Sequence, residues 1–211
     1  GVYSVVSGYS GGPEINPTYQ QVASGGTGHT EAVQVSFNPE KITYQQILTV
    51  LWMSMDPTDA GGQFADRGSQ YRPEIFVHSK EQRKAAKASK AELAASNTFS
   101  LPIVVPITSF VTFYPAEDYH QNFYKTNPAR YYGYRRASGR EGFLKKTWGD
   151  KLNNPLGPRP QARAQRPRPD REPVAYGPQS GHMCVTNAYH IQTSLPDGAA
   201  PSPIDPDNVG T

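Results

Sequence analysis

The residue whose type and position point most directly to chemistry is Glu31, in the stretch GGTGHTEAVQVSF over residues 25–37. Val33, Val35 and Phe37 alternate with polar residues, which predicts a strand with one buried face. Counting back by twos places Glu31 on that same face. A carboxyl at the rim of an apolar sheet face is poorly solvated when ionised, so we expect a raised pKa. Such a group can hold or deliver a proton near neutral pH, as a general acid does.

The surroundings of Glu31 also allow other interpretations. Its carboxylate could pair with a surface Lys or Arg at a strand end, and spacing alone does not decide between the two roles. His29 could supply half of a metal site, but no partner at helical His spacing follows it. We therefore predict no metal site and assign His29 no chemical role. His120 is interpreted as a packed or hydrogen-bonded structural residue.

Three further residues could hydrogen-bond a ligand beside such an acid. Tyr19 ends a loop over residues 8–19 that is dense in Gly, Pro and Asn, while Asp66 and Tyr71 lie in the polar, glycine-rich stretch 56–74. Long loops in compact domains are usually functional. A loop Tyr more commonly covers apolar surface, however, and a surface Asp would look no different in sequence. The residues alone leave both interpretations open.

Helices and short strands are expected to position these residues. Thr43 and Gln46 form a capping box, and apolar residues recur on one face over 44–55, so this helix packs on the sheet. A second capping box at Ser79 opens an exposed helix that ends near residue 96. Strands are expected at residues 2–6, before Gly8, and at 75–78, 101–108 and 110–114. A short helix is expected to start near residue 115, and residues 127–150 are expected to wrap around the domain.

Composition divides the chain into a folded unit and a tail. Of the 211 residues 36% are hydrophobic, and 11 of the 20 prolines follow Lys151. Leu, Ile, Val and Phe become scarce in the same region. We therefore expect one domain over residues 1–150 and a disordered, Pro/Arg-rich tail over residues 151–211. A domain of about 150 residues can bury one good core.

Charge and cysteine content exclude several classes of function. A formal charge of +3 is too small to argue for nucleic-acid binding, and no apolar run could span a bilayer. Arginines in the tail could contact RNA or an acidic surface, but a solvated overhang is the simpler interpretation. The single cysteine, Cys184, excludes an internal disulfide and a cysteine-based metal site. Both reducing and oxidising compartments tolerate one thiol. We favour the cytoplasm and leave export open.

Four strings occur in order along the chain: NPTY at 16–19, GHTEAV at 28–33, ADRGSQYRPEIF at 65–76 and FYPAEDYHQ at 113–121. Together they resemble peptide methionine sulfoxide reductase of the A type, from Gly1 to about residue 150. Four motifs with compatible spacing are far more specific than one short pattern. The resemblance implies an α+β fold, a single domain with a mixed β-sheet flanked by helices, followed here by a long irregular tail.

The resemblance also implies a reaction. A cysteine thiolate attacks the sulfur of an S-configured methionine sulfoxide, free or in proteins, and leaves methionine and a sulfenic acid. Glu31 matches the acid that protonates the sulfoxide oxygen, Tyr19 and Tyr71 match hydroxyls that hydrogen-bond it, and Asp66 matches an acidic residue of the same pocket. No bound cofactor is implied, and thioredoxin or another thiol supplies the electrons. We expect a soluble monomer that acts in protein repair under oxidative stress.

The nucleophile of this reaction is not found in the sequence. The family's cysteine lies in a GCFWG motif shortly upstream of the position matched by Gly1, so this chain supplies no nucleophile of its own. Cys184, in GHMCVTN, does not match the glycine-rich setting of a recycling cysteine. Two alternatives therefore stand beside the reductase: a non-catalytic module that binds oxidised methionine, and an interaction protein that acts through its basic tail.

Overall fold

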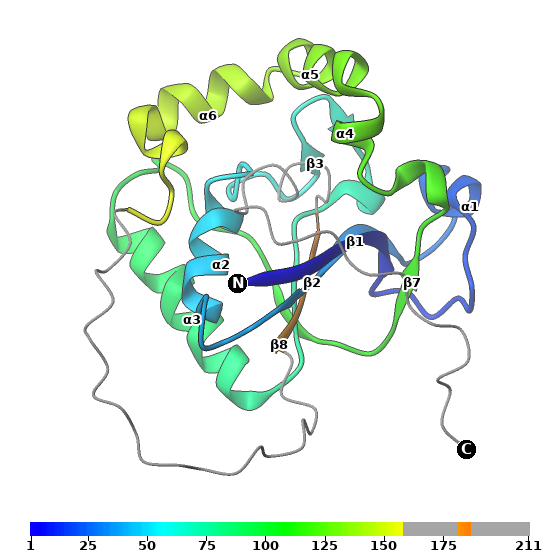
Figure 1. Ribbon diagram of the computed structural model, residues 1–211, viewed down its shortest axis with the longest axis horizontal. Coiled ribbons are helices and arrows are strands. Elements are labelled where there is room, and N and C mark those ends of the chain that lie inside the picture. Colours follow the sequence, from blue (N-terminus) through cyan, green and yellow to red (C-terminus); the bar gives the residue numbers. More distant parts are fainter. Residues whose placement is uncertain (158–180, 187–211) are drawn as a thin grey trace, which may run out of the picture.

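The domain is built on one mixed β-sheet (Figure 1). The computed structural model describes residues 1–157 and 181–186, whose strands are β1 (Val2–Ser10), β2 (Thr30–Phe37), β3 (Gly62–Gln63), β4 (Asp66–Arg67), β5 (Ile75–Val77), β6 (Ile107–Ser109), β7 (Phe113–Pro115) and β8 (Gly181–Thr186). Six of them pair in the order β6-β5-β8-β2-β1-β7, and β3 and β4 form a separate hairpin. The pair β5–β6 is parallel and the other neighbours are antiparallel.

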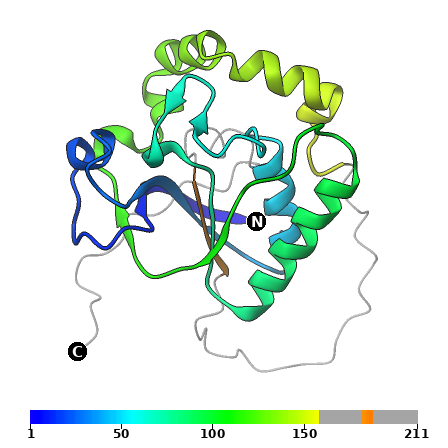
Figure 2. The same cartoon turned by 180° about the vertical axis from the view of Figure 1, so that it is seen from behind.

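Helices flank this sheet and close one end of the molecule. They are α1 (Tyr19–Ala23), α2 (Tyr44–Trp52), η1 (Ser69–Tyr71), α3 (Lys80–Ala95), η2 (Asp118–His120), α4 (Phe123–Thr126), α5 (Pro128–Ala137), α6 (Arg140–Trp148) and η3 (Gly149–Asn153). Helices α5 and α6 lie along one end of the molecule in both Figure 1 and Figure 2, so the segment 127–150 wraps the domain as expected. The arrangement confirms the α+β fold with a mixed sheet flanked by helices.

The two long helices begin at their expected caps. Thr43 and Gln46 form a capping box at the start of α2. The hydroxyl of Ser79 accepts a hydrogen bond of 3.2 Å from the backbone N–H of Gln82 at the start of α3. In a complete capping box the side-chain oxygen of Gln82 would accept from the backbone N–H of Ser79. It accepts instead from the backbone N–H of His78, at 2.9 Å. Both helix starts are therefore satisfied by side chains, as helix N-termini require.

The main core lies between α2, α3 and one face of the sheet. Val33 and Val35 of β2 pack there with Leu48 of α2 and Met183 of β8, and all four side chains are fully buried. Burying each such side chain contributes roughly 1.5–3 kcal/mol, so this packing fixes the helices on the sheet. A smaller cluster on the opposite face contains Ala32, Phe76 and Cys184.

Strand β1 is longer than the sequence predicted. It runs through Gly8, where an end was expected, and continues to Ser10. A Cβ added at Gly8 would lie 2.3 Å from the ring of Phe113 and from the carbonyl oxygen of Tyr114. Glycine is therefore required here for the close approach of β7 and does not end the strand.

The two strands expected after residue 100 are shorter than predicted. The stretch 101–108 contributes only to β6, which lies at the sheet edge as its prolines indicated. The stretch 110–114 overlaps β7 only at Phe113 and Tyr114. Residues 110–112 are irregular, and the expected helix near 115 is the single turn η2.

The structure of residues 181–186 differs most from what the sequence predicted. Composition placed them in a solvated tail, whereas they form β8 in the middle of the sheet, between β2 and β5. Met183 and Cys184 are fully buried on opposite faces of the sheet. A strand covered on both faces carries consecutive apolar residues, as the run Met183-Cys184-Val185 does. Residues 151–157 of the expected tail are also described: they end η3, and Leu156 packs against the main core. The remaining tail residues, 158–180 and 187–211, lie outside the described residues.

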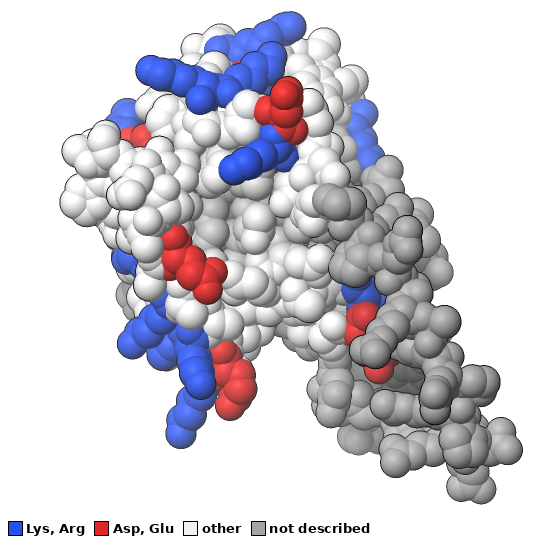
Figure 3. Space-filling model, turned by 90° about the vertical axis from the view of Figure 1, so that its left-hand side faces the viewer, with Lys and Arg blue, Asp and Glu red and all other residues white. Residues whose placement is uncertain are grey.

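The surface shown in Figure 3 carries charges of both signs. Lys and Arg side chains lie there in separate groups, at the level of α6 and at the level of α3, with acidic side chains beside them. Nucleic-acid-binding domains instead collect basic residues on one continuous face. Among the residues with a described structure, no helix combines the length and apolar character needed to cross a membrane.

The position of β8 leads to a stability prediction. Met183→Ala should lower the free energy of unfolding by about 2–4 kcal/mol, because it removes a fully buried side chain and leaves a cavity. Urea unfolding followed by circular dichroism measures this. Leu101→Ala, at a side chain that is 62% exposed, is the control and should change stability by less than about 0.5 kcal/mol. Equal stability of the two variants would show that β8 is not packed in the sheet.

Candidate active site

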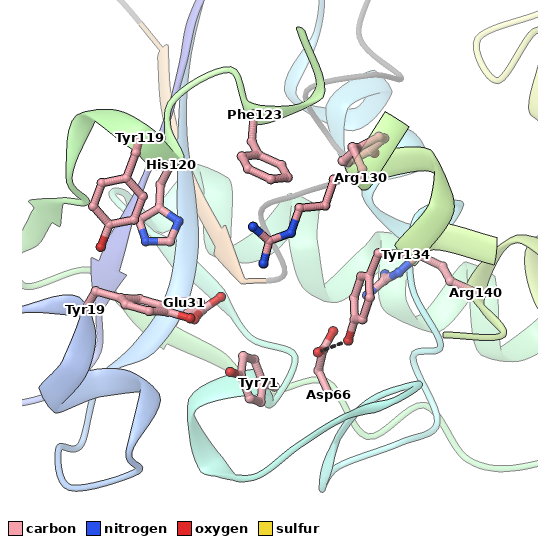
Figure 4. A pocket seen from close by; sticks show the side chains of 11 residues that line it. Tyr19, Glu31, Asp66, Tyr71, Tyr119, His120, Phe123, Arg130, Tyr134 and Arg140 are labelled. Atoms are coloured by element: carbon pink, nitrogen blue, oxygen red, sulfur yellow. Dashed lines mark hydrogen bonds between the residues drawn. The ribbon is translucent and has the colours of Figure 1, made fainter. Parts of the chain in front are cut away.

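One cavity brings together residues from both halves of the domain (Figure 4). Its volume is about 540 Å³, and its walls come from β2, α1, β4, η1 and the segment from η2 to α6. The four residues singled out from the sequence, Tyr19, Glu31, Asp66 and Tyr71, all line it. The loops and the strand that carry them therefore converge on one space.

Glu31 lies at the start of β2, directly opposite Tyr9 of β1. The Glu31 residue is only 9% exposed to solvent. Burial raises the pKa of the Glu31 carboxyl from 4.5 to about 7, and the negative charge of Asp66 adds to the rise. The expectation of a buried carboxyl with a raised pKa is confirmed. Both faces of the strand are covered here, because Thr30 and Ala32 are also buried.

Hydrogen bonds from β2 hold Tyr71 beside Glu31. The hydroxyl of Thr30 donates to the backbone carbonyl of Gln70 at 2.9 Å, which ties η1 to the start of β2. The side-chain amide of Gln70 donates in turn to the carbonyl of Ala23, at 2.9 Å, at the end of α1. Burial raises the pKa of the Tyr71 phenol to about 12, and Glu31 adds to this, so the hydroxyl remains a hydrogen-bond donor at neutral pH.

Tyr19 is placed by α1, a helix that the sequence analysis treated as loop. Thr18 and Gln21 form its capping box. The backbone N–H of Tyr19 donates to one carboxylate oxygen of Glu117 at 2.9 Å, and the hydroxyl of Tyr9 donates to the other at 2.8 Å. One carboxylate outside the cavity thus anchors two tyrosines near Glu31. The ring of Tyr19 packs against His120, with centroids 4.5 Å apart.

Asp66 is held in the β3–β4 hairpin by residues of α5 and α6. The Tyr134 hydroxyl donates a hydrogen bond to its carboxylate, as Figure 4 shows. The hairpin turn contains Phe64 at a positive φ of 57°, which is a strained conformation for a bulky residue. The guanidinium of Arg140 lies 4.4 Å from the Phe64 ring and donates to the carbonyl of Ser54 at 2.9 Å. These contacts stabilise the turn that directs Asp66 into the cavity.

His29 has a structural role. Its Nδ1 accepts from the backbone N–H of Gly12 at 3.2 Å, so Nε2 carries the proton and donates to the carbonyl of Glu14 at 2.8 Å. Both ring nitrogens are used to fix the loop before α1. In the described parts of the chain, no group of three or more His, Cys, Asp or Glu side chains is arranged to hold a metal ion.

Cys184 is absent from the cavity lining. It lies within β8, fully buried against Ala32 and Phe76. Burial raises the pKa of its thiol to about 12, so the reactive thiolate is scarce at neutral pH. The structure gives this thiol neither the exposure nor the ionisation of a nucleophile.

The sequence analysis missed the half of the cavity that α4, α5 and α6 supply. Phe123, Arg130, Tyr131, Tyr134 and Arg140 all line it. Their segment shows no clear helical periodicity, so it was interpreted only as a wrapping segment. The available signal was composition, because Tyr and Arg together in a segment with few aliphatic residues are typical of binding surfaces. His120, expected to be a structural residue, also lines the cavity, and burial lowers the pKa of its ring.

Comparisons with known proteins agree with this geometry. The family model "Peptide methionine sulfoxide reductase" matches residues 1–152. The chain is 54% identical over 148 residues to "Peptide methionine sulfoxide reductase MsrA" of Listeria monocytogenes serotype 4a (strain HCC23), covering 70% of this chain and 84% of the relative. It is 54% identical over 151 residues to the protein of the same name from Bacillus subtilis (strain 168), covering 72% and 85%. The crystal structure of Mxr1 from Saccharomyces cerevisiae in reduced form matches with a TM-score of 0.57 and 32% identity, covering 60% of this chain and 72% of that one.

The raised pKa of Glu31 predicts a specific pH dependence of stability. Between pH 4.5 and about 7 the folded protein keeps the Glu31 proton that the unfolded chain loses, so stability falls as pH rises through this window. Relative to Glu31→Gln, the wild-type protein should lose up to about 3 kcal/mol between pH 4 and pH 8. Urea unfolding of both proteins at each pH measures this difference. A constant difference would mean that the carboxyl titrates near its ordinary pKa.

The contribution of Asp66 to this pKa can be measured separately. Asp66→Asn should lower the pKa of Glu31, because it removes a neighbouring negative charge, yet leave it above 4.5, because burial is the larger cause. Titration of the Glu31 carboxyl carbon by NMR measures the change. Asp59→Asn is the control, since Asp59 pairs with Arg67 and does not line the cavity. An unchanged Glu31 pKa in Asp66→Asn would exclude the coupling.

Proposed function

The chain belongs to the peptide methionine sulfoxide reductase family, and from this premise we propose that Glu31 donates the proton that the sulfoxide oxygen needs in order to leave. The reaction of the family is the reduction of methionine sulfoxide. The observation that carries the proposal is the buried Glu31 carboxyl, with a pKa of about 7, in a cavity that also contains Tyr19 and Tyr71. A general acid works best when its pKa lies near the operating pH.

The proposed reaction balances as a two-electron transfer. A thiolate attacks the sulfoxide sulfur and forms a sulfur–sulfur bond, while the oxygen takes the proton of Glu31 and leaves as hydroxide. The hydroxide then attacks the thiol sulfur, which breaks the sulfur–sulfur bond, releases methionine and leaves the thiol as a sulfenic acid. A second thiol then converts the sulfenic acid into a disulfide and releases water. Oxygen is a poor leaving group unless it is protonated, so the step depends on an acid that is still protonated at working pH.

Tyr19, Tyr71 and Asp66 are proposed to position the sulfoxide. The two phenols remain protonated, because burial and Glu31 raise their pKa values, so both can donate to the sulfoxide oxygen. Asp66 keeps Glu31 protonated through its negative charge. With the oxygen fixed on this side of the cavity, one enantiomer presents its sulfur to the thiolate. On the family resemblance we propose the S form.

The attacking thiol is proposed to come from a cysteine upstream of Gly1, the position that the family resemblance gives to GCFWG. Cys184 does not fit the role, because its thiol is buried, has a raised pKa and does not line the cavity. Thioredoxin or a small dithiol is proposed to return the thiol to its reduced form. The two other readings, a sulfoxide-binding module and a tail-mediated interaction protein, are not favoured, since relatives at 54% identity are named reductases.

Glu31→Gln should lower kcat/KM for reduction of methionine sulfoxide by roughly 10²–10⁴-fold, because it removes the proton donor and keeps the side-chain shape. The assay uses the protein extended upstream through its GCFWG segment, with dithiothreitol as reductant and S-configured N-acetyl-methionine sulfoxide amide as substrate. Glu40→Gln removes an exposed carboxyl and should leave kcat/KM unchanged.

The same assay applied to residues 1–211 tests the source of the thiol. No turnover is expected from this chain, whereas the extended protein should be active. Turnover by residues 1–211 that survives Cys184→Ser would contradict a protein thiol altogether, and turnover that Cys184→Ser abolishes would assign the role to Cys184. Inactivity of both the short and the extended proteins would contradict the proposed function.

A further inference from the structure

The cavity has a second polar feature besides the group around Glu31. Its volume of about 540 Å³ lies within the roughly 300–1,000 Å³ of sites that enclose drug-sized ligands. One methionine sulfoxide side chain therefore does not fill it, which leaves room for the thiol proposed to lie upstream of Gly1 and for neighbouring substrate groups. Phe123 of α4 and Arg130 of α5 face Glu31 across the cavity (Figure 4), and Tyr131 of α5 also lines it.

Arg130 is the cation that faces Glu31 across the cavity. Its side chain extends from α5 and its guanidinium points into the cavity, toward the space between Glu31 and Tyr134 (Figure 4). The guanidinium carbon lies 5.9 Å from the centre of the Phe123 ring, which supports the side chain from one side. Among the residues whose structure is described, no carboxylate lies within ion-pair distance of Arg130, although three other Lys or Arg side chains there pair with carboxylates.

The other charged groups that line the cavity do not offset the positive charge of Arg130. The buried guanidinium of Arg140 interacts with the negative charge of Asp66, so the positive and negative charges of this pair offset each other. Glu31 is largely neutral below its pKa of about 7, and burial lowers the pKa of His120, which disfavours a positive charge on its ring. Arg130 also acts across the cavity, because it opposes the rise in the Tyr19 pKa that burial and Glu31 cause. The lining therefore carries one excess positive charge in the state that binds substrate.

We propose that Arg130 binds a substrate carboxylate that lies next to the oxidised methionine, so that the enzyme prefers sulfoxides with an adjacent negative charge. This inference rests on the proposed function, because it assumes that the sulfoxide lies beside Glu31. A guanidinium binds a carboxylate through two parallel hydrogen bonds, which an apolar wall would not provide. The carboxylate can be the α-carboxylate of free or C-terminal methionine sulfoxide, or the side chain of a neighbouring Asp or Glu.

Binding measurements test this preference without requiring turnover. Isothermal titration calorimetry at pH 6 and low salt compares three blocked ligands with residues 1–211. N-acetyl-methionine sulfoxide N-methylamide carries no charge, N-acetyl-methionine sulfoxide carries an α-carboxylate, and N-acetyl-methionine sulfoxide-aspartate amide carries a side-chain carboxylate. At least one charged ligand should bind about five- to tenfold more tightly than the neutral one. Which of the two does so identifies the source of the carboxylate. The preference should weaken in 0.5 M salt.

Arg130→Gln should bring the charged ligands to the affinity of the neutral ligand and leave the neutral ligand within about twofold of wild type. Arg130→Lys should retain part of the preference, because it keeps the charge and loses the paired hydrogen bonds. Arg136→Gln is the matched control, since it removes an exposed arginine of the same helix that does not line the cavity. It should preserve the preference.

Two results would overturn the inference. One is an equal affinity of all three ligands for the wild-type protein. The other is an equal loss for all three in Arg130→Gln, which would mean that Arg130 contacts the sulfoxide or supports the wall. The affinities of the corresponding thioethers distinguish a failure of the Arg130 inference from a failure of the proposed function. If the neutral sulfoxide bound no better than its thioether, the sulfoxide site beside Glu31 and the carboxylate site would both be contradicted.

Discussion

The burial of one carboxyl without a cationic partner is the constraint on which the rest of the site depends. Within the described residues, Glu31 faces Tyr9 across the strand pair and shares the cavity with phenols and Asp66, and forms no ion pair. A carboxyl in this setting is stable mainly as the neutral acid, and Glu31 keeps its proton up to about pH 7. The surrounding structure must therefore be stable enough to hold an unfavourable group, and the two clusters that cover both faces of β2 provide that stability.

Most of the bonds that shape the site connect parts of the chain that are far apart in sequence. Thr30 bonds to Gln70, Tyr9 and Tyr19 bond to Glu117, and Tyr134 bonds to Asp66. The short elements that carry these residues could not hold the side chains in place by themselves, because η1 has three residues, α1 has five, and β3 and β4 have two each. The cavity exists only when the sheet, the loops and the wrapping helices are assembled together.

The fold and the inner half of the site could be predicted because their signals are local. Strand parity placed Glu31 on a buried face, and the cap residues Thr43 and Ser79 located the starts of α2 and α3. The outer half could not be predicted, because Arg130 and Tyr134 lie on a helix whose weak periodicity gives no inward face. Gly8 was misread because a glycine that admits a neighbouring strand and one that ends a strand look alike in sequence.

The central position of β8 has a consequence for synthesis of the protein. A growing chain that has emerged from the ribosome as far as residue 157 already exposes β2 and β5, but β8, their partner in the sheet, has not yet emerged. Until then both strands expose unpaired backbone groups, which are templates for association with other chains. The pairing also joins residues more than a hundred positions apart, as between Phe76 and Cys184, and such distant contacts slow folding. The pairing of β2 and β5 with β8 therefore has to wait until residues 181–186 have left the ribosome.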